Sequence, residues 1–224
     1  MLRSDQKNRD LNKFWDSEEI DWGFYSNLLE EVRRMDNGLI EFSQGFGWNT
    51  GVYTGTHMFS SLLYNWAKLI NARNILEIGI GYGRTTYWLA HAAKELMGKY
   101  TGIDIENERI MVLREYFEKH NLHGTFFNVD TNSLDSIWFA RNVGKEINLA
   151  FLDGNHKKET ICHEMEVLYP LIARDGYGYV FVHDVMTESQ EGWEAIISDP
   201  RYEFEHLMIK KNPGMGVLRK MVAR

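Results

Sequence analysis

The chain has 224 residues, a net charge of −7 and an apolar share of 44%, which suit a globular protein large enough to bury a core. The acidic balance argues against nucleic acid as a partner, and no apolar run is long enough to cross a membrane. Cys162 is the single cysteine, so no intramolecular disulfide can form, and the polar N-terminus lacks the apolar core of a signal peptide. We therefore expect a cytoplasmic protein.

Residues 1–70 are expected to form an N-terminal helical and aromatic cap or lid. Glycines alternate with aromatic residues between Gly45 and Gly55, which suits a loop that moves and offers apolar contact surface. This region is expected to be a lid or a wall of the acceptor pocket, an aromatic helical layer packed on the sheet edge, or both. Four of the seven tryptophans lie in it: Trp15, Trp22, Trp48 and Trp66.

Residues 71–224 alternate between short apolar runs and amphipathic segments. This alternation predicts a Rossmann-like, doubly wound α/β fold with a mostly parallel sheet. Two final apolar runs around a Pro-Gly turn predict an antiparallel hairpin that closes the sheet. The expected strands span residues 74–78, 100–104, 125–129, 148–152, 177–183, 202–209 and 215–221, and the expected helices span 84–97, 108–120, 134–143 and 157–172.

The turn after the first expected strand carries the most specific motif. Glu77 ends the strand, and Gly79, Gly81 and Gly83 follow at alternate positions before a helix opens. Glycines there let a ligand approach bare backbone at a helix N-terminus. A dinucleotide fingerprint needs a glycine where Arg84 stands, which disfavours an NAD(P)-dependent oxidoreductase. The E-x-G-x-G-x-G spacing instead resembles the first motif of class I S-adenosylmethionine (SAM) methyltransferases.

Acidic residues lie at five successive strand ends, at the edge where open parallel sheets bind ligands. Asp104 is placed to accept hydrogen bonds from the ribose hydroxyls of SAM, and Asp130 from its adenine amino group. Glu77 would lie under the glycine turn, near the methionine amino group. Each aspartate could instead cap a helix, since aspartate is favoured at that position. The five residues are Glu77, Asp104, Asp130, Asp153 and Asp184.

A second group of residues follows the fourth and fifth strands. Asp153 and Asp184 would be neighbours in the sheet and could bind Mg²⁺ or another divalent cation. Such a metal would lower the pKa of an acceptor hydroxyl. His156 is a candidate general base. His183 is a further ligand, a second base or a structural hydrogen-bonding group.

The D-G-x-H run at 153–156 and the H-D-V run at 183–185 are similar to small-molecule O-methyltransferases, including the catechol and macrolide-sugar enzymes. The resemblance covers residues 70–224 and implies methyl transfer from SAM to a hydroxylated small molecule. It also implies that residues 56–58 close over SAM. Val185 stands where the catechol type has an asparagine metal ligand. A catalytically inactive SAM-binding partner and a methyltransferase acting on protein stay open, as does homo-oligomerisation.

Overall fold

The computed structural model describes residues 56–174 and 176–221. They belong to one compact unit, Gly51–Arg224. The expected aromatic loop between Gly45 and Gly55 lies outside the described residues, as do residues 1–55 of the expected cap over 1–70.

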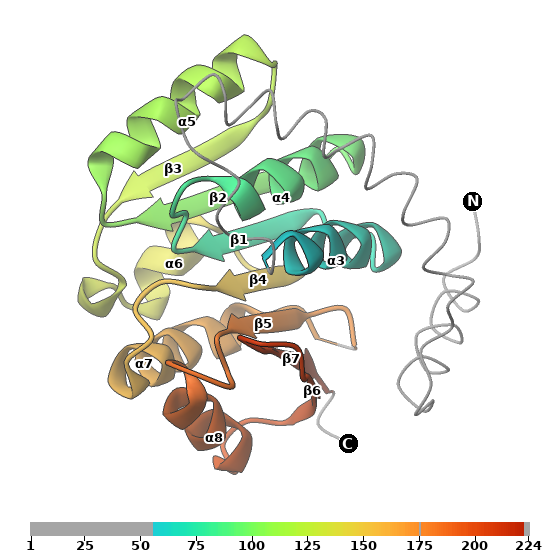
Figure 1. Cartoon of the computed structure of the whole chain (residues 1–224), viewed down its shortest axis with the longest axis vertical. Coiled ribbons are helices and arrows are strands. Elements are labelled where there is room, and N and C mark those ends of the chain that lie inside the picture. Colours follow the sequence, from blue (N-terminus) through green and yellow to red (C-terminus); the bar gives the residue numbers. More distant parts are fainter. Residues whose placement is uncertain (1–55, 175, 222–224) are drawn as a thin grey trace. The chain divides into compact units, whose positions relative to one another are not determined.

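The centre of this unit is a seven-stranded sheet with the order β3-β2-β1-β4-β5-β7-β6. The first five strands are parallel, and their arrowheads meet at one edge in Figure 1. The last two form the antiparallel hairpin, so the predicted fold is confirmed. The strands are β1 (Asn74–Ile78), β2 (Lys99–Asp104), β3 (Gly124–Asn128), β4 (Leu149–Leu152), β5 (Tyr179–His183), β6 (Phe204–Ile209) and β7 (Met215–Lys220).

Helices cover both faces of the sheet (Figure 1). On one side, α3 packs against α4, which contacts β1 and β2, while α5 contacts β3. On the other side, α7 contacts both α6 and α8. The helices are α3 (Thr56–Leu69), α4 (Arg84–Glu95), α5 (Asn107–Lys119), α6 (Ser136–Asn142), α7 (Lys158–Leu168) and α8 (Gln190–Ser198), with 3₁₀ turns η2 (Thr131–Ser133) and η3 (Tyr169–Leu171).

Three predicted helices are shorter than expected, and two of them have clear local reasons. The expected helix over 134–143 begins only at Ser136, because the Asp135 carboxylate accepts a hydrogen bond from the Trp138 amide at 2.7 Å and caps it there. The expected helix over 157–172 ends as an α-helix at Leu168. Pro170 follows in the 3₁₀ turn η3, since proline cannot continue the α-helical hydrogen bonding.

Helix α8 was not predicted from the sequence. It packs its buried Trp193 against β7, where a Cβ atom on Gly216 would come within 2.4 Å of the indole ring. Glycine is therefore required at position 216 for α8 to lie this close to the strand. Since β7 pairs with β5, this packing also supports the strand that ends in His183.

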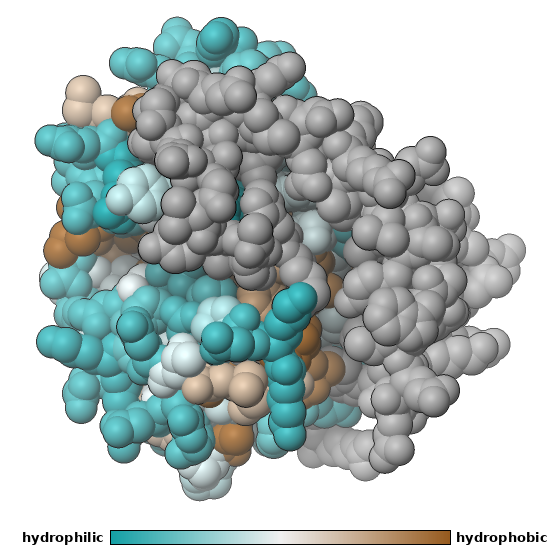
Figure 2. All heavy atoms as spheres, in the orientation of Figure 1, coloured by the Kyte–Doolittle hydropathy of each residue, from teal (hydrophilic) through white to brown (hydrophobic). Residues whose placement is uncertain are grey.

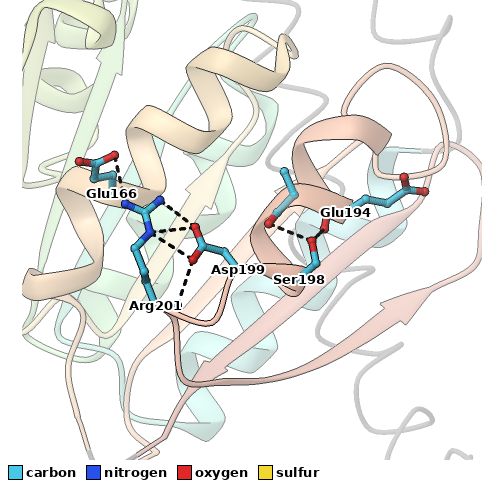
Figure 3. A network of polar contacts seen from close by, with 6 residues as sticks. Glu166, Glu194, Ser198, Asp199 and Arg201 are labelled. Carbon is cyan, nitrogen blue, oxygen red and sulfur yellow. Dashed lines mark hydrogen bonds and ion pairs between the residues drawn. The ribbon is translucent and has the colours of Figure 1, made fainter.

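The surface around α7 and α8 is polar. The described part of the face in Figure 2 is mostly hydrophilic, with apolar atoms in small separate areas. Figure 3 shows Arg201 between Asp199, at 2.7 Å, and Glu166 of α7, at 3.9 Å. Such exposed pairs contribute little to stability. None of the described helices is long and apolar enough to cross a membrane.

Candidate active site

A cavity of about 280 Å³ opens at the carboxyl ends of the parallel strands. It is bordered by the glycine turn, the residues after β2, the turn η2 and the residues after β4, with Glu164 of α7 beside them. Of the predicted site residues, five line this cavity: Gly79, Gly81, Asp104, Asp130 and Asp153. The other five do not line it: Glu77, Gly83, His156, His183 and Asp184.

The three glycines of the turn have positive φ angles of 85°, 55° and 75° but different surroundings. A Cβ atom on Gly79 would lie 2.1 Å from the carbonyl oxygen of Asp153, so the protein itself requires glycine there. Gly83 precedes α4, and its carbonyl accepts from the Tyr87 amide at 2.9 Å. A Cβ atom on Gly81 would meet nothing within 4 Å. Gly81 is therefore the glycine that leaves room for a ligand.

Asp104 links the glycine turn to the end of β2 by hydrogen bonds. Its Oδ2 atom accepts hydrogen bonds from the amides of Ile80, at 2.9 Å, and Gly81, at 3.0 Å. Its Oδ1 atom accepts from the Glu106 amide at 2.8 Å. A carboxylate offers about four acceptor positions. One therefore remains on Oδ1 for a hydroxyl donor in the cavity.

Asp130 caps the 3₁₀ turn η2. Its Oδ1 atom accepts from the backbone amide and from the side-chain amide of Asn132, both at 3.0 Å. The structure therefore shows the capping role that the sequence left open. The residue also borders the cavity, and its contact with adenine stays a prediction.

Glu77 lies beneath the turn, but its side chain does not line the cavity. It is fully buried, and its Oε2 atom accepts from the hydroxyls of Thr86, at 2.8 Å, and Tyr100. Its Oε1 atom is buried without a hydrogen bond. Burial raises the pKa of Glu77 to about 8, although these two hydroxyls oppose the rise. The carboxyl group is therefore mostly neutral at pH 7.

His183 lies between two carboxylates at the tips of β4 and β5. Its Nδ1 atom is 3.1 Å from Asp153 Oδ1 and 3.1 Å from Asp184 Oδ1, without the angle of a good hydrogen bond to either. Burial alone would lower the pKa of His183, but the two carboxylates outweigh it and raise the pKa to about 10. Without a cation at this position the imidazole is therefore positively charged at neutral pH, which makes it a poor second base, and a cation bound by His183 would have to displace this proton.

The turn after β5 brings a further residue to the site. Asp184 has a left-handed backbone (φ 59°), and its carbonyl accepts from the amides of Thr187, at 2.9 Å, and Ser189, at 3.0 Å. This closed turn places the buried Ser189 hydroxyl 3.0 Å from Nδ1 of His156. Sequence reasoning missed Ser189, since no motif marks it and α8, which follows it, was not foreseen.

Hydrogen bonding orients the His156 ring. Its Nδ1 atom faces both Ser189 and Asp184 Oδ2, the latter at 3.5 Å, while Nε2 lies 3.8 Å from Glu188 Oε2. A Ser-His-Asp triad needs its serine and aspartate on opposite ring nitrogens, so these residues do not form one. When Nδ1 carries the proton and donates it to Ser189 Oγ, beside the Asp184 carboxylate, Nε2 keeps the lone pair that a general base requires.

Two groups of side chains in the described part of the chain could hold a metal ion. One comprises Asp153, His183 and Asp184, and the other His156, Asp184 and Glu188. The first fits a cation better, because Nδ1 of His183 is buried without a good hydrogen bond. An imidazole with two carboxylates suits Mn²⁺, Fe²⁺ or Zn²⁺ more than Mg²⁺. The Val185 side chain is buried in the core and adds no ligand.

The sheet order, the glycine turn and the acidic strand ends together define the fold of class I SAM-dependent methyltransferases. Residues 76–185 match the family model described as a methyltransferase domain. The predicted class is thereby confirmed. In sequence, the chain is 24% identical over 190 residues to a ribosomal protein L11 methyltransferase of Thermotoga neapolitana, covering 82% of this chain and 66% of that protein.

Solved structures share the fold at low identity. The O-methyltransferase from Bacillus cereus in complex with S-adenosylhomocysteine (SAH) is 17% identical, with a TM-score of 0.60 over 95% of this chain and 97% of that one. The O-methyltransferase TomG from Streptomyces achromogenes, involved in tomaymycin synthesis and solved with SAM, is 16% identical, with a TM-score of 0.61 over 99% and 100%. The SAH-bound methyltransferase PaMTH1 from Podospora anserina is 13% identical, with a TM-score of 0.60 over 98% and 97%.

Proposed function

We propose that this protein transfers the methyl group of SAM to a hydroxyl group of a small molecule. The observation that carries the proposal is the group of Asp153, His156, His183 and Asp184 at the tips of β4 and β5. Asp153 also borders the cavity beside the glycine turn. The site therefore joins a cofactor cavity to groups that can bind and deprotonate a hydroxyl.

The cavity residues are assigned to parts of SAM by their chemistry. Asp104 keeps an acceptor position for the ribose hydroxyls, and Asp130 and η2 border the space for adenine. Gly81 leaves the backbone open to the cofactor. Glu77 supports the turn from below, and its proposed influence on the methionine amino group acts through the turn, because its side chain is outside the cavity.

The chemistry requires an acceptor oxygen in line with the sulfonium methyl group and a base for its proton. In the proposed reaction the oxygen lone pair forms the new C–O bond as the C–S bond breaks, which leaves SAH. Nε2 of His156 takes the hydroxyl proton. A divalent cation held by Asp153, His183 and Asp184 would polarise the acceptor hydroxyl when bound.

A protein acceptor is the second candidate, and the likeness to a ribosomal protein L11 methyltransferase favours it. The two are separated by assaying the full chain with SAM against hydroxylated small molecules and, in parallel, purified ribosomal protein L11. Release of SAH is measured with and without a chelator. SAH release with L11 alone would overturn the small-molecule proposal, as would its absence with every acceptor.

His156→Ala tests the base. We expect turnover to fall by about 10²–10⁴-fold, the usual contribution of a general base, with unchanged affinity for SAH. The exposed His123 provides the matched control, since His123→Ala removes an imidazole outside the site. Wild-type turnover in His156→Ala would remove the base from the mechanism.

A further inference from the structure

Glu164 is a buried carboxyl group to which the proposed mechanism gives no part. It comes from α7 and is only 1% exposed, yet it borders the cavity next to η2. The Thr131 hydroxyl donates to its Oε1 atom at 2.7 Å. Its Oε2 atom accepts no hydrogen bond from the described residues. The carboxyl group is thus held by one oxygen, and its other oxygen is left for a donor in the cavity.

Asp130 provides a contrast at the same end of the cavity. Its Oδ1 atom already accepts two hydrogen bonds from Asn132, and the side chain lies at the exposed rim. The Glu164 residue is only 1% exposed, so a carboxyl oxygen that a bound ligand covers there without donating to it costs more free energy than one at the exposed rim. Burial raises the pKa of Glu164 to about 7. A donor on Oε2 would favour its ionised form.

We propose that Glu164 determines specificity for the base of the cofactor, with Oε2 accepting a hydrogen bond from the 6-amino group of adenine. This inference rests on the proposed binding of SAM in the cavity. When Glu164 is ionised, a base with a 6-oxo group directs an acceptor at Oε2 and leaves both oxygens unpaired, whereas the protonated carboxyl group could donate to that oxo group. Glu164 thus selects adenine against hypoxanthine.

The test is isothermal titration of the full chain at about pH 8.5, above the pKa of about 7 at which Glu164 ionises, with SAH and with S-inosyl-L-homocysteine, which carries the 6-oxo base. We expect the wild type to bind SAH at least about 10-fold more tightly, because the mismatched base leaves a buried acceptor unpaired. In Glu164→Gln, Thr131 holds the amide oxygen, and the amide NH₂ group faces the cavity as a donor. The preference should then reverse toward the inosyl compound, which loss of structure alone would not produce.

Two controls accompany this variant. Glu166→Gln makes the same change at an exposed position of α7, with the side chain 64% exposed, and should keep the wild-type preference. Thr131→Val removes the hydroxyl but keeps the carboxyl group, so it should still favour SAH.

The outcomes separate this inference from the function on which it rests. Wild-type protein that binds no SAH would overturn both. Equal binding of the two compounds by the wild type would overturn the role of Glu164 alone, and this measurement needs no variant to fold. A folded Glu164→Gln protein that retains the wild-type preference would likewise overturn it.

Discussion

Among single residues, the buried carboxyl group of Glu77 should make the stability of the folded protein depend on pH. Its pKa is about 8 in the folded protein against a usual 4.5, so between these values the folded state binds more protons than the unfolded one. The contribution of Glu77 to stability therefore falls as pH rises from about 4.5 to about 8, by up to about 1.4 kcal/mol per pH unit. Glu77→Gln keeps the shape and removes the titration.

We expect the difference in free energy of unfolding, Glu77→Gln minus wild type, to become steadily more positive between pH 5 and pH 8. Urea unfolding at three pH values measures it, and the contribution of His183 cancels in the difference. Glu118→Gln, at an exposed site on α5, is the control. A constant difference across this pH range would show that Glu77 does not titrate there.

Asp104 and Asp130 are both aspartates at strand ends, but they should differ in their effect on cofactor binding. Asp104→Ala removes charge-assisted bonds to three backbone amides. It also removes the acceptor proposed for the ribose, so we expect SAH affinity to fall by at least about 10-fold, since one charge-assisted hydrogen bond contributes about 1.5–3 kcal/mol. Asp130→Ala removes a helix cap, which costs about 0.5–2 kcal/mol of stability. Titration with SAH compares them, and an unchanged affinity in Asp104→Ala would show that the ribose site is misassigned.

At the level of elements, two glycines of the same turn should have different roles. Gly79 is needed for folding, and Gly81 is needed for cofactor binding. Gly79→Ala would force Cβ against the Asp153 backbone at 2.1 Å with φ at 85°, so we expect a loss of about 2–5 kcal/mol of stability. The Cβ atom of Gly81→Val would meet no atom of the described residues within 4 Å. The substitution should cost only backbone strain, about 1–3 kcal/mol, but abolish SAH binding. Thermal unfolding and titration compare the two, and normal SAH binding by Gly81→Val would make the turn purely structural.

The elements also show how far sequence reasoning reaches. The strands were predicted to within about two residues, β1 without error, because each is a short apolar run between polar helices. Helix α8 was missed because it has only nine residues and contains Gly192, a weak helix former. That glycine is needed where α8 packs on α7, since a Cβ atom there would lie 2.8 Å from Ile161. Such a contact between distant segments has no local sequence signal.

The residues of the candidate site also differ in whether the sequence alone could reveal them. The acids that follow parallel strands were found because topology alone brings strand ends together. Ser189 and Glu164 were not, because their partners, His156 and Thr131, lie 33 residues away in each case. The direction of the Glu77 side chain away from the cavity likewise depends on which face of β1 it occupies beside Tyr100.

For the whole unit, residues at or just after the ends of four strands, β1 to β4, line the cavity. A ligand bound there should therefore raise the free energy of global unfolding. At a SAH concentration about 100 times its Kd, we expect about 2.7 kcal/mol of added stability. In a chain of this size this corresponds to a rise in Tm of about 5–10 °C. NAD should give no rise, because Arg84 takes the place of the third glycine of a dinucleotide turn. Differential scanning calorimetry measures both, with Gly81→Val as the control that should lose the response to SAH. An equal rise with NAD would show a general nucleotide cavity, and the selectivity inferred from the glycine turn would be wrong.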